Sequence, residues 1–200
     1  MSTWALVPVK ARHAGKQRLV AALDDEARAR LIRRMLDDVL GALTACPAIE
    51  GTLVMSPERD ALPARVPLLN DPAAGMNAAL DLALASLGQR GATCVALIAA
   101  DLPLLSPAEV TELVAAARAA GLALAPDARG TGTNAIGLML PTQFRCHFGP
   151  GSYALHQAEA ARQGIAAAPV LRPGLAFDVD ETADLAALTA RGLPRYGFLR

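Results

Sequence analysis

The sequence predicts an α/β fold with a mainly parallel central sheet. Apolar, strand-like segments alternate with helix-like segments along all 200 residues, and this alternation is typical of parallel strands joined by helices. Hydrophobic residues make up 53% of the chain and charged residues 19%, which excludes a disordered chain and provides a full core. No linker-like stretch or internal repeat divides the sequence, so we expect residues 1–200 to form a single domain.

The N-terminal half supplies three expected strands and two expected helices. Residues 5–9 form a short apolar run that contains a proline, and we expect a buried strand there. Residues 26–43 carry apolar side chains at helical spacing, with two aspartates just before them that can cap a helix. Strands are expected at 52–56 and, more weakly, at 66–69. A helix follows at 76–87, and a glycine directly after it can end it.

The C-terminal half continues the alternation. Residues 94–99 are all apolar and form the clearest buried strand of the chain. The helix expected at 107–120 has Ser106 as its N-cap, proline at its first position and Gly121 after its end. The remaining segments, in order, are strands at 122–125 and 135–140, a helix at 152–162, a strand at 165–171 and a helix at 181–191.

The composition also excludes several classes of partner. Nineteen basic residues balance nineteen acidic ones, whereas a general nucleic-acid binder would show a basic excess. No apolar stretch reaches the length of a membrane span, and the N-terminus lacks the pattern of a signal peptide. The cysteines Cys46, Cys94 and Cys146 are odd in number and far apart, which favours buried thiols in a reducing compartment. We therefore expect a cytoplasmic protein with neither nucleic-acid nor membrane partners.

In sheets of this kind ligands bind at the carboxyl ends of the strands, so the loops there hold the candidate functional residues. The loop after the first strand contains both lysines of the chain, Lys10 and Lys16, together with Arg12 and Arg18. Converging cations suit a polyanion such as a triphosphate. The loop matches neither the P-loop nor the Rossmann fingerprint, and a solvated basic loop is its plain structural alternative.

The loop before the helix at 76–87 is a candidate nucleotide-binding segment. Asp71 begins this loop, Gly75 permits close approach of a ligand to the backbone, and Asn77 offers both a donor and an acceptor. A carboxamide of this kind suits the edge of a nucleobase. An ordinary loop leading into a helix explains the same residues equally well.

Two further loops suit a small anion. Residues 126–134 combine glycines, threonines and an asparagine, and such a density of hydroxyl and N–H groups exceeds what a simple turn needs. Residues 148–152 lead into a helix whose free N-terminus can bind a phosphate or carboxylate, although a plain N-cap explains the serine there as well. The residues expected to bind this substrate are Thr133, Asn134, Gly149 and Ser152.

Three aspartates are candidate metal ligands. Asp101 follows the clearest buried strand, where a magnesium ligand would stand. Asp178 and Asp180 are two residues apart and, on a strand, would face the same side. Carboxylates gathered in this way repel one another unless a cation lies between them. An aspartate in a turn and an isolated D-x-D pattern are the structural alternatives, but the three together predict a Mg²⁺ site.

Six stretches carry a resemblance that spans nearly the whole chain: VPVKARHAGKQRL, DPAAGMNAAL, AADLPLL, PDARGTGTNAIGL, FGPGSYALH and FDVDETADL. In this order they resemble the 2-phospho-L-lactate guanylyltransferase family of coenzyme F-420 biosynthesis, within the molybdopterin-guanylyltransferase-like nucleotidyltransferases. The resemblance implies a Rossmann-like three-layer sandwich of the nucleotide-diphospho-sugar transferase type. It also implies GMP transfer from GTP, with release of pyrophosphate, to 2-phospho-L-lactate, phosphoenolpyruvate or 3-phospho-D-glycerate.

The resemblance also assigns residues. It implies that Lys10 binds phosphate, and we expect the other cations of this loop, Arg12, Lys16 and Arg18, to help neutralise the triphosphate. It makes Thr133, Gly149 and Ser152 the acceptor pocket, and Asp101, Asp178 and Asp180 the ligands of Mg²⁺. The arginine-rich composition suggests a bacterial protein and favours phosphoenolpyruvate or 3-phosphoglycerate as acceptor. A related transferase with a molybdopterin or sugar-phosphate acceptor and a non-catalytic nucleotide-binding regulator are the alternatives, and the sequence is compatible with a homodimer.

Overall fold

A computed structural model of the chain describes residues 2–9, 16–57, 68–70 and 75–199. Its strands begin and end within about two residues of the expected positions in most cases. The last strand is shorter than expected, because the segment that follows it turns into a short helix. The strands are β1 (Thr3–Pro8), β2 (Gly51–Ser56), β3 (Leu68–Asn70), β4 (Cys94–Ile98), β5 (Leu122–Pro126), β6 (Thr133–Met139) and β7 (Ala167–Pro169).

The strands form a mainly parallel sheet, as predicted. In the described part of the chain it has seven strands in the order β3-β2-β1-β4-β6-β5-β7. Only β6 runs against its neighbours, since it is antiparallel to both β4 and β5. One consequence matters for function: β6 begins at the edge of the sheet where the parallel strands end. The first residues of β6 therefore lie beside the residues that follow β4, where the backbone N–H of Ala99 donates to the carbonyl of Asn134.

The helices follow from their caps and apolar faces. Asp24 accepts a hydrogen bond from the backbone N–H of Ala27 at the start of α1. Ser106 and Glu109 form a complete capping box before α3, and Gly121 ends that helix at a φ of +89°. The sequence patterns did not predict α5 or the C-terminal 3₁₀ segment Pro194–Leu199. The helices are α1 (Asp25–Thr44), α2 (Met76–Gln89), α3 (Pro107–Ala120), α4 (Ser152–Arg162), α5 (Pro173–Ala176) and α6 (Thr182–Ala190), with a 3₁₀ turn at Gln17–Leu19.

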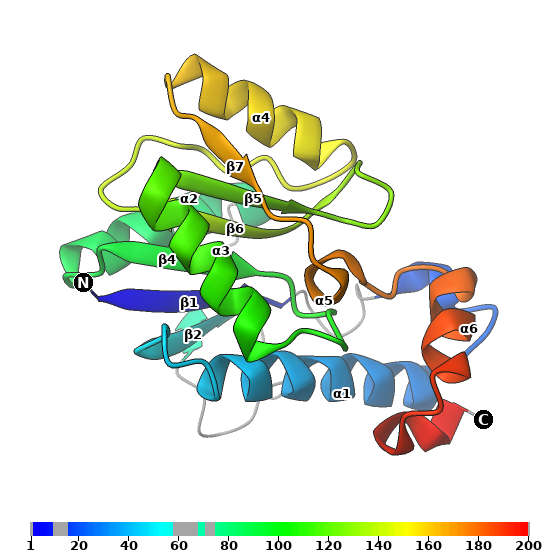
Figure 1. Cartoon of the computed structure of the whole chain (residues 1–200). Helices are drawn as coiled ribbons and strands as arrows, with labels where there is room; N and C mark the ends of the chain where they lie inside the picture. Colours follow the sequence, from blue (N-terminus) through cyan, green and yellow to red (C-terminus); the bar gives the residue numbers. More distant parts are fainter. Residues whose placement is uncertain (1, 10–15, 58–67, 71–74, 200) are drawn as a thin grey trace.

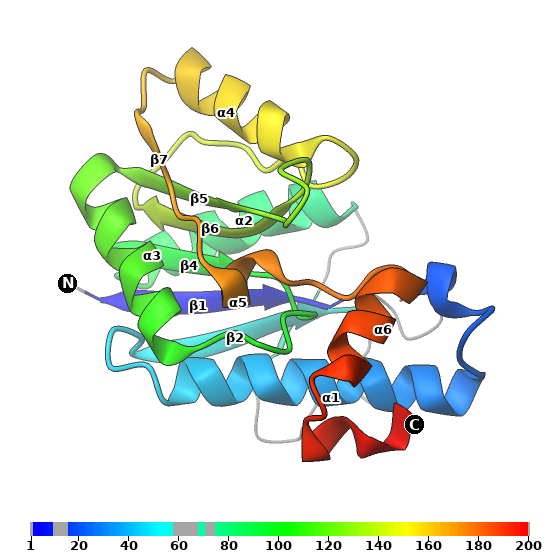
Figure 2. The same cartoon turned by 45° about the vertical axis from the view of Figure 1, so that its right-hand side comes forward.

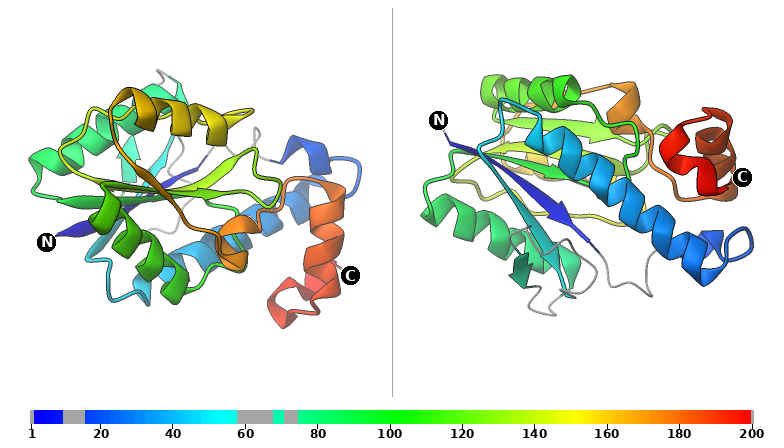
Figure 3. Two further views of the ribbon diagram at one scale, coloured as in Figure 1. Left: turned by 45° about the horizontal axis from the view of Figure 1, so that its top comes forward. Right: turned by 90° about the horizontal axis from the view of Figure 1, so that it is seen from below.

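The molecule is a three-layer sandwich (Figure 1). Apolar residues of α1 and α3 pack on one face of the sheet, and those of α2 and α4 pack on the other, as the left view of Figure 3 shows. The thiols of Cys46, Cys94 and Cys146 are free and buried among these layers, as expected. None of the helices in the described part of the chain combines the length and apolar character needed to cross a membrane.

A third, smaller core holds the C-terminal segment beside the end of the sheet. Leu185 and Leu188 of α6 and Tyr196 of the last 3₁₀ segment pack with Leu31 and Met35 of α1. Figure 2 shows the result: α6 lies beyond the tip of the β1 arrow, next to the N-terminal part of α1. The segment between α5 and α6 is thereby held across the carboxyl edge of the sheet.

Candidate active site at the carboxyl edge of the sheet

Three carboxylates meet at this edge. Asp101 follows β4, while Asp178 and Asp180 lie between α5 and α6, and one oxygen of each lies within 4.8 Å of the others. The sequence placed the latter two on a strand, and this was wrong: residues 177–180 form no strand in the structure. They face the same way for another reason. Val179 between them is fully buried in the small C-terminal core, so its two neighbours turn to the opposite side.

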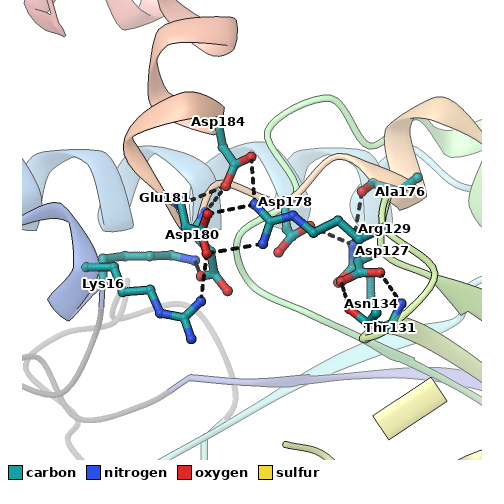
Figure 4. A network of polar contacts seen from close by, with 11 residues as sticks. Lys16, Asp127, Arg129, Thr131, Asn134, Ala176, Asp178, Asp180, Glu181 and Asp184 are labelled. Atoms are coloured by element: carbon teal, nitrogen blue, oxygen red, sulfur yellow. Dashed lines mark hydrogen bonds and ion pairs between the residues drawn. The ribbon is translucent and has the colours of Figure 1, made fainter. Parts of the chain in front are cut away.

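Lys16 is the counter-ion of this acidic cluster. Its ammonium group forms ion pairs with Asp101 and, at 2.6 Å, with Oδ1 of Asp180, and its side chain is only 8% exposed. Burial alone would lower the pKa of Lys16, but the two carboxylates outweigh it and raise the pKa above its usual value. A residue expected to neutralise phosphates is thus paired with two of the three aspartates, and Figure 4 shows it beside one of them, Asp180.

The surroundings of Asp178 disfavour its charged form. Its burial, and then the charge of Asp101, raise its pKa to about 6, although a hydrogen bond from Asn134 acts in the other direction. The donor set consists of three carboxylates, the hard oxygen ligands that Mg²⁺ prefers. The crowding of their charges is what a divalent cation would relieve, so these residues fit such an ion.

Asn134 holds Asp178 through a hydrogen bond. Its carboxamide nitrogen donates to Oδ1 of Asp178 at 3.2 Å and to the carbonyl of Leu175 at 3.0 Å, and the residue is 6% exposed. The sequence predicts that this carboxamide faces the acceptor. In the structure its N–H groups donate to groups of the protein, and they link a carboxylate of the cluster to α5.

The two glycine-rich loops predicted to bind an anion do lie together. The backbone N–H of Thr133 donates to Oγ of Ser152 at 2.9 Å, and the N–H of Tyr153 donates to the carbonyl of Thr131 at 3.1 Å. Thr133 and Ser152 are both buried. The sequence suggested Ser152 as the N-cap of α4, but Gly151 occupies that position at a φ of +71°. The hydroxyl of Ser152 instead accepts a hydrogen bond from β6.

The loop before α4 is held in place by α2. Asn77 accepts a hydrogen bond from the backbone N–H of Phe148 at 2.8 Å and donates one to the carbonyl of the same residue at 3.1 Å. The side chain predicted to read a nucleobase thus has a donor and an acceptor engaged on this loop. Gly75 precedes α2 at a φ of +87°, and a Cβ there would meet no atom of the described residues within 4 Å, so that part of the chain leaves its backbone open to a ligand.

The remaining predicted residues lie at the rim or outside the described residues. Arg18 is exposed and pairs with Glu181 at 3.0 Å. Arg129, which was not among the predicted residues, forms an ion pair with Glu181 at 3.0 Å, and Figure 4 shows the two side chains together. It belongs to the loop 126–134, and a positive charge in a loop predicted to bind an anion is the sequence feature that could have indicated it. The predicted residues Lys10, Arg12 and Asp71 lie outside the described residues.

Comparisons with known proteins identify the family and the fold of the chain. The family model described as guanylyl transferase CofC like matches residues 3–199. The phosphoenolpyruvate guanylyltransferase of Sphaerobacter thermophilus is 38% identical over 94% of this chain and 93% of its own length. The 2-phospho-L-lactate guanylyltransferase of Halorubrum lacusprofundi is 41% identical over 86% and 78%, respectively. A candidate nucleotide-diphospho-sugar transferase from Desulfovibrio desulfuricans G20 covers 100% of this chain and 95% of its own at 18% identity, and its TM-score of 0.80 shows the same fold.

Proposed function

The chain belongs to the guanylyl transferase CofC-like family and is a nucleotidyltransferase that moves GMP onto a phosphorylated three-carbon acid, and from this premise we propose that its acceptor is phosphoenolpyruvate. The name of the Sphaerobacter relative supports this acceptor, and that of the Halorubrum relative supports 2-phospho-L-lactate as the alternative. The observation that carries the assignment to this edge of the sheet is the acidic cluster and its link to the acceptor loops. Asp178 of the cluster accepts a hydrogen bond from Asn134, and Asn134 directly follows Thr133, which contacts Ser152.

The charged residues of the edge would bind the triphosphate. Asp101, Asp178 and Asp180 would hold Mg²⁺, which supplies positive charge to the phosphates and to the departing pyrophosphate when it is bound. Lys16 is paired with Asp101 and Asp180 of this cluster, and on this proposal it passes from the carboxylates to the phosphates. We propose that Lys10, Arg12 and Arg18 neutralise the same charges.

The acceptor is proposed to lie against Thr133 and the turn from Gly149 to Ser152. One oxygen of its phosphate attacks the α-phosphorus of GTP, the bond from that phosphorus to the β-phosphate oxygen breaks, and pyrophosphate leaves. The attacking oxygen is already anionic, so no general base is required. The protein's contribution is then position and charge neutralisation. The backbone around Gly75 and Asp71 is proposed for the nucleoside, with Asn77 acting through Phe148.

The first test of the function is acceptor-dependent release of pyrophosphate from GTP. The proposal predicts that phosphoenolpyruvate starts this release and that chelation of Mg²⁺ stops it. A protein that binds GTP but releases no pyrophosphate with any phosphorylated three-carbon acid would be a nucleotide-binding regulator instead. This assay therefore separates an enzyme from a binding protein before the residues are tested.

Replacement of Ser152 by alanine should affect the acceptor more than GTP. The variant removes a hydroxyl from the proposed acceptor site, so the KM for the acceptor should rise more than the KM for GTP in steady-state kinetics. It also leaves the buried N–H of Thr133 without its partner, which should cost about 1 kcal/mol of stability in a denaturant titration. A rise confined to the KM for GTP would place this turn on the nucleotide side.

Replacement of Lys10 by alanine should slow the reaction with little effect on stability. The loss of one charge-stabilising donor typically costs on the order of a hundredfold in rate. The measurement is kcat/KM for GTP together with the melting temperature, and Arg172→Ala is the control, because it removes a positive charge from an exposed ion pair with Glu112. Wild-type turnover in Lys10→Ala would contradict the role of this lysine.

A further inference from the structure

His156 is a buried polar residue that has no role in the reaction described above. It lies one turn into α4 and is 0% exposed. Its two ring nitrogens contact two different elements. Nε2 lies 2.9 Å from the backbone nitrogen of His147, and Nδ1 lies 2.9 Å from Oγ1 of Thr133. The histidine therefore joins the loop before α4 to the first residue of β6.

The contact with His147 fixes where the ring proton lies. A backbone N–H can only donate, so Nε2 of His156 must accept and cannot carry a proton. Burial, and then the nearby His147, lower the pKa of His156 to about 4, so the ring is neutral at physiological pH. A neutral imidazole with a bare Nε2 carries its proton on Nδ1.

This tautomer decides the role of the Thr133 hydroxyl. Because Nδ1–H donates to Oγ1, the hydroxyl accepts from the histidine and keeps its own hydrogen to donate elsewhere. The hydroxyl of Ser152 likewise keeps its hydrogen to donate, since its Oγ accepts a hydrogen bond from the backbone N–H of Thr133. Among the residues that the structure describes, no group accepts a hydrogen bond from either hydroxyl. The hydroxyls of Thr133 and Ser152 are therefore free to donate two hydrogen bonds to one ligand.

We propose that His156 is a positioning residue that fixes the Thr133 hydroxyl as a donor and thereby selects an anionic acceptor. A phosphate or carboxylate oxygen only accepts hydrogen bonds at neutral pH, so it complements two donors. A substrate that presented a hydroxyl or ammonium hydrogen at this point would place a donor against a donor, and no hydrogen bond would form. The inference rests on the proposed function, because it names how the same site recognises the acceptor.

Two amide substitutions separate the two contacts of the histidine. In His156→Gln the amide can reach the place of Nε2 and accept from His147, but the donor to Thr133 is lost. In His156→Asn the amide lies near the place of Nδ1 and can donate to Thr133, but the contact with His147 is lost. Both variants lose some stability, so each is the control of the other for a purely structural effect.

The proposal predicts that His156→Gln raises the KM for the acceptor about tenfold and leaves the KM for GTP unchanged, since a hydrogen bond to a charged group is weakened. His156→Asn should keep an acceptor KM near that of the wild type. In a Thr133→Val background, His156→Gln should add nothing further to the acceptor KM, because the hydroxyl through which it acts is gone. The reverse ranking of the two variants, an equal rise of both KM values or full additivity with Thr133→Val would overturn the proposal.

A readout without turnover tests the same point. In the ¹⁵N spectrum of histidine-labelled wild-type protein at neutral pH, His156 should show a protonated Nδ1 and a bare Nε2. A proton on Nε2 would overturn the proposal. If the wild-type enzyme guanylylated no phosphorylated acid at all, the proposed function would fail, whereas the spectrum would still decide the tautomer.

Discussion

Asp178→Asn should slow turnover strongly and, in EDTA above pH 6, raise the melting temperature of the protein. The pKa of this carboxyl is raised to about 6 by burial and by the charge of Asp101, so the folded state binds its proton more tightly than the unfolded chain does. Stability then falls as the pH rises from the unfolded value near 4 to about 6, and the penalty is fully present above that range. The amide removes the penalty and still accepts from Asn134, a gain on the order of 1–2 kcal/mol after allowance for partial solvent exposure.

Asp101→Asn is the matched control, and its melting temperature in EDTA should fall. It removes a carboxylate that pairs directly with the buried ammonium of Lys16, so an ion pair is lost along with the repulsion. Activity should drop in both variants, on the order of 10²–10³-fold, because each removes charge stabilisation from the triphosphate site. Melting curves in EDTA at pH 5 and pH 8 separate the two cases. A lower melting temperature for Asp178→Asn at pH 8 would show a carboxylate satisfied by its hydrogen bonds rather than one that is crowded.

Lys16→Met should bind Mg²⁺ more tightly than the wild type in the absence of GTP, although it turns over more slowly. In the wild type an incoming cation competes with the ammonium group for Asp101 and Asp180. Removal of that competitor should raise the affinity for Mg²⁺ about tenfold, which corresponds to about 1.4 kcal/mol. In EDTA the variant should lose about 1–3 kcal/mol of stability, less than a fully buried pair would cost, because Asp180 is half exposed.

Isothermal titration with Mg²⁺ measures this affinity. Arg172→Met removes a charge from an exposed pair far along the sequence, between Arg172 and Glu112, and should leave the Mg²⁺ affinity unchanged. A Mg²⁺ affinity for Lys16→Met that equals that of the wild type would mean that the ammonium and the cation do not compete for one position. The proposed transfer of Lys16 from carboxylates to phosphates would then be wrong.

The sequence predicted those features that depend on neighbouring residues. The capping box of Ser106 and Glu109 and the apolar face of α1 are local patterns, and both helices begin within a residue of the expected position. The meeting of Asp101 with Asp178 and Asp180 was predicted from the rule that the strand ends of a parallel sheet share one edge, but this rule accounts only for Asp101, which follows β4. The expected strand under the two C-terminal aspartates was wrong, since the burial of Val179 in the C-terminal core replaces strand pairing there.

The features that the sequence did not predict depend on partners far along the chain. Asn77 is engaged by the backbone of Phe148, 71 residues away, and Asn134 by Asp178, 44 residues away. Their carboxamides suited a ligand as well as a loop, and only the folded arrangement shows which partner each has. The tautomer of His156 is a similar case, because it depends on one backbone N–H that no pattern of residue types identifies.

The most direct test of the central claim is the mass of the product formed from GTP, Mg²⁺ and each of three acids: phosphoenolpyruvate, 2-phospho-L-lactate and 3-phospho-D-glycerate. The account predicts that the phosphoenolpyruvate reaction yields a species with the mass of the acid plus GMP less water, together with one pyrophosphate per product. It also predicts that the Asp101→Asn variant forms this species on the order of 10²–10³-fold more slowly. GTP consumption without any acid-dependent product, or a GMP adduct formed only with molybdopterin or a sugar phosphate, would contradict the assignment.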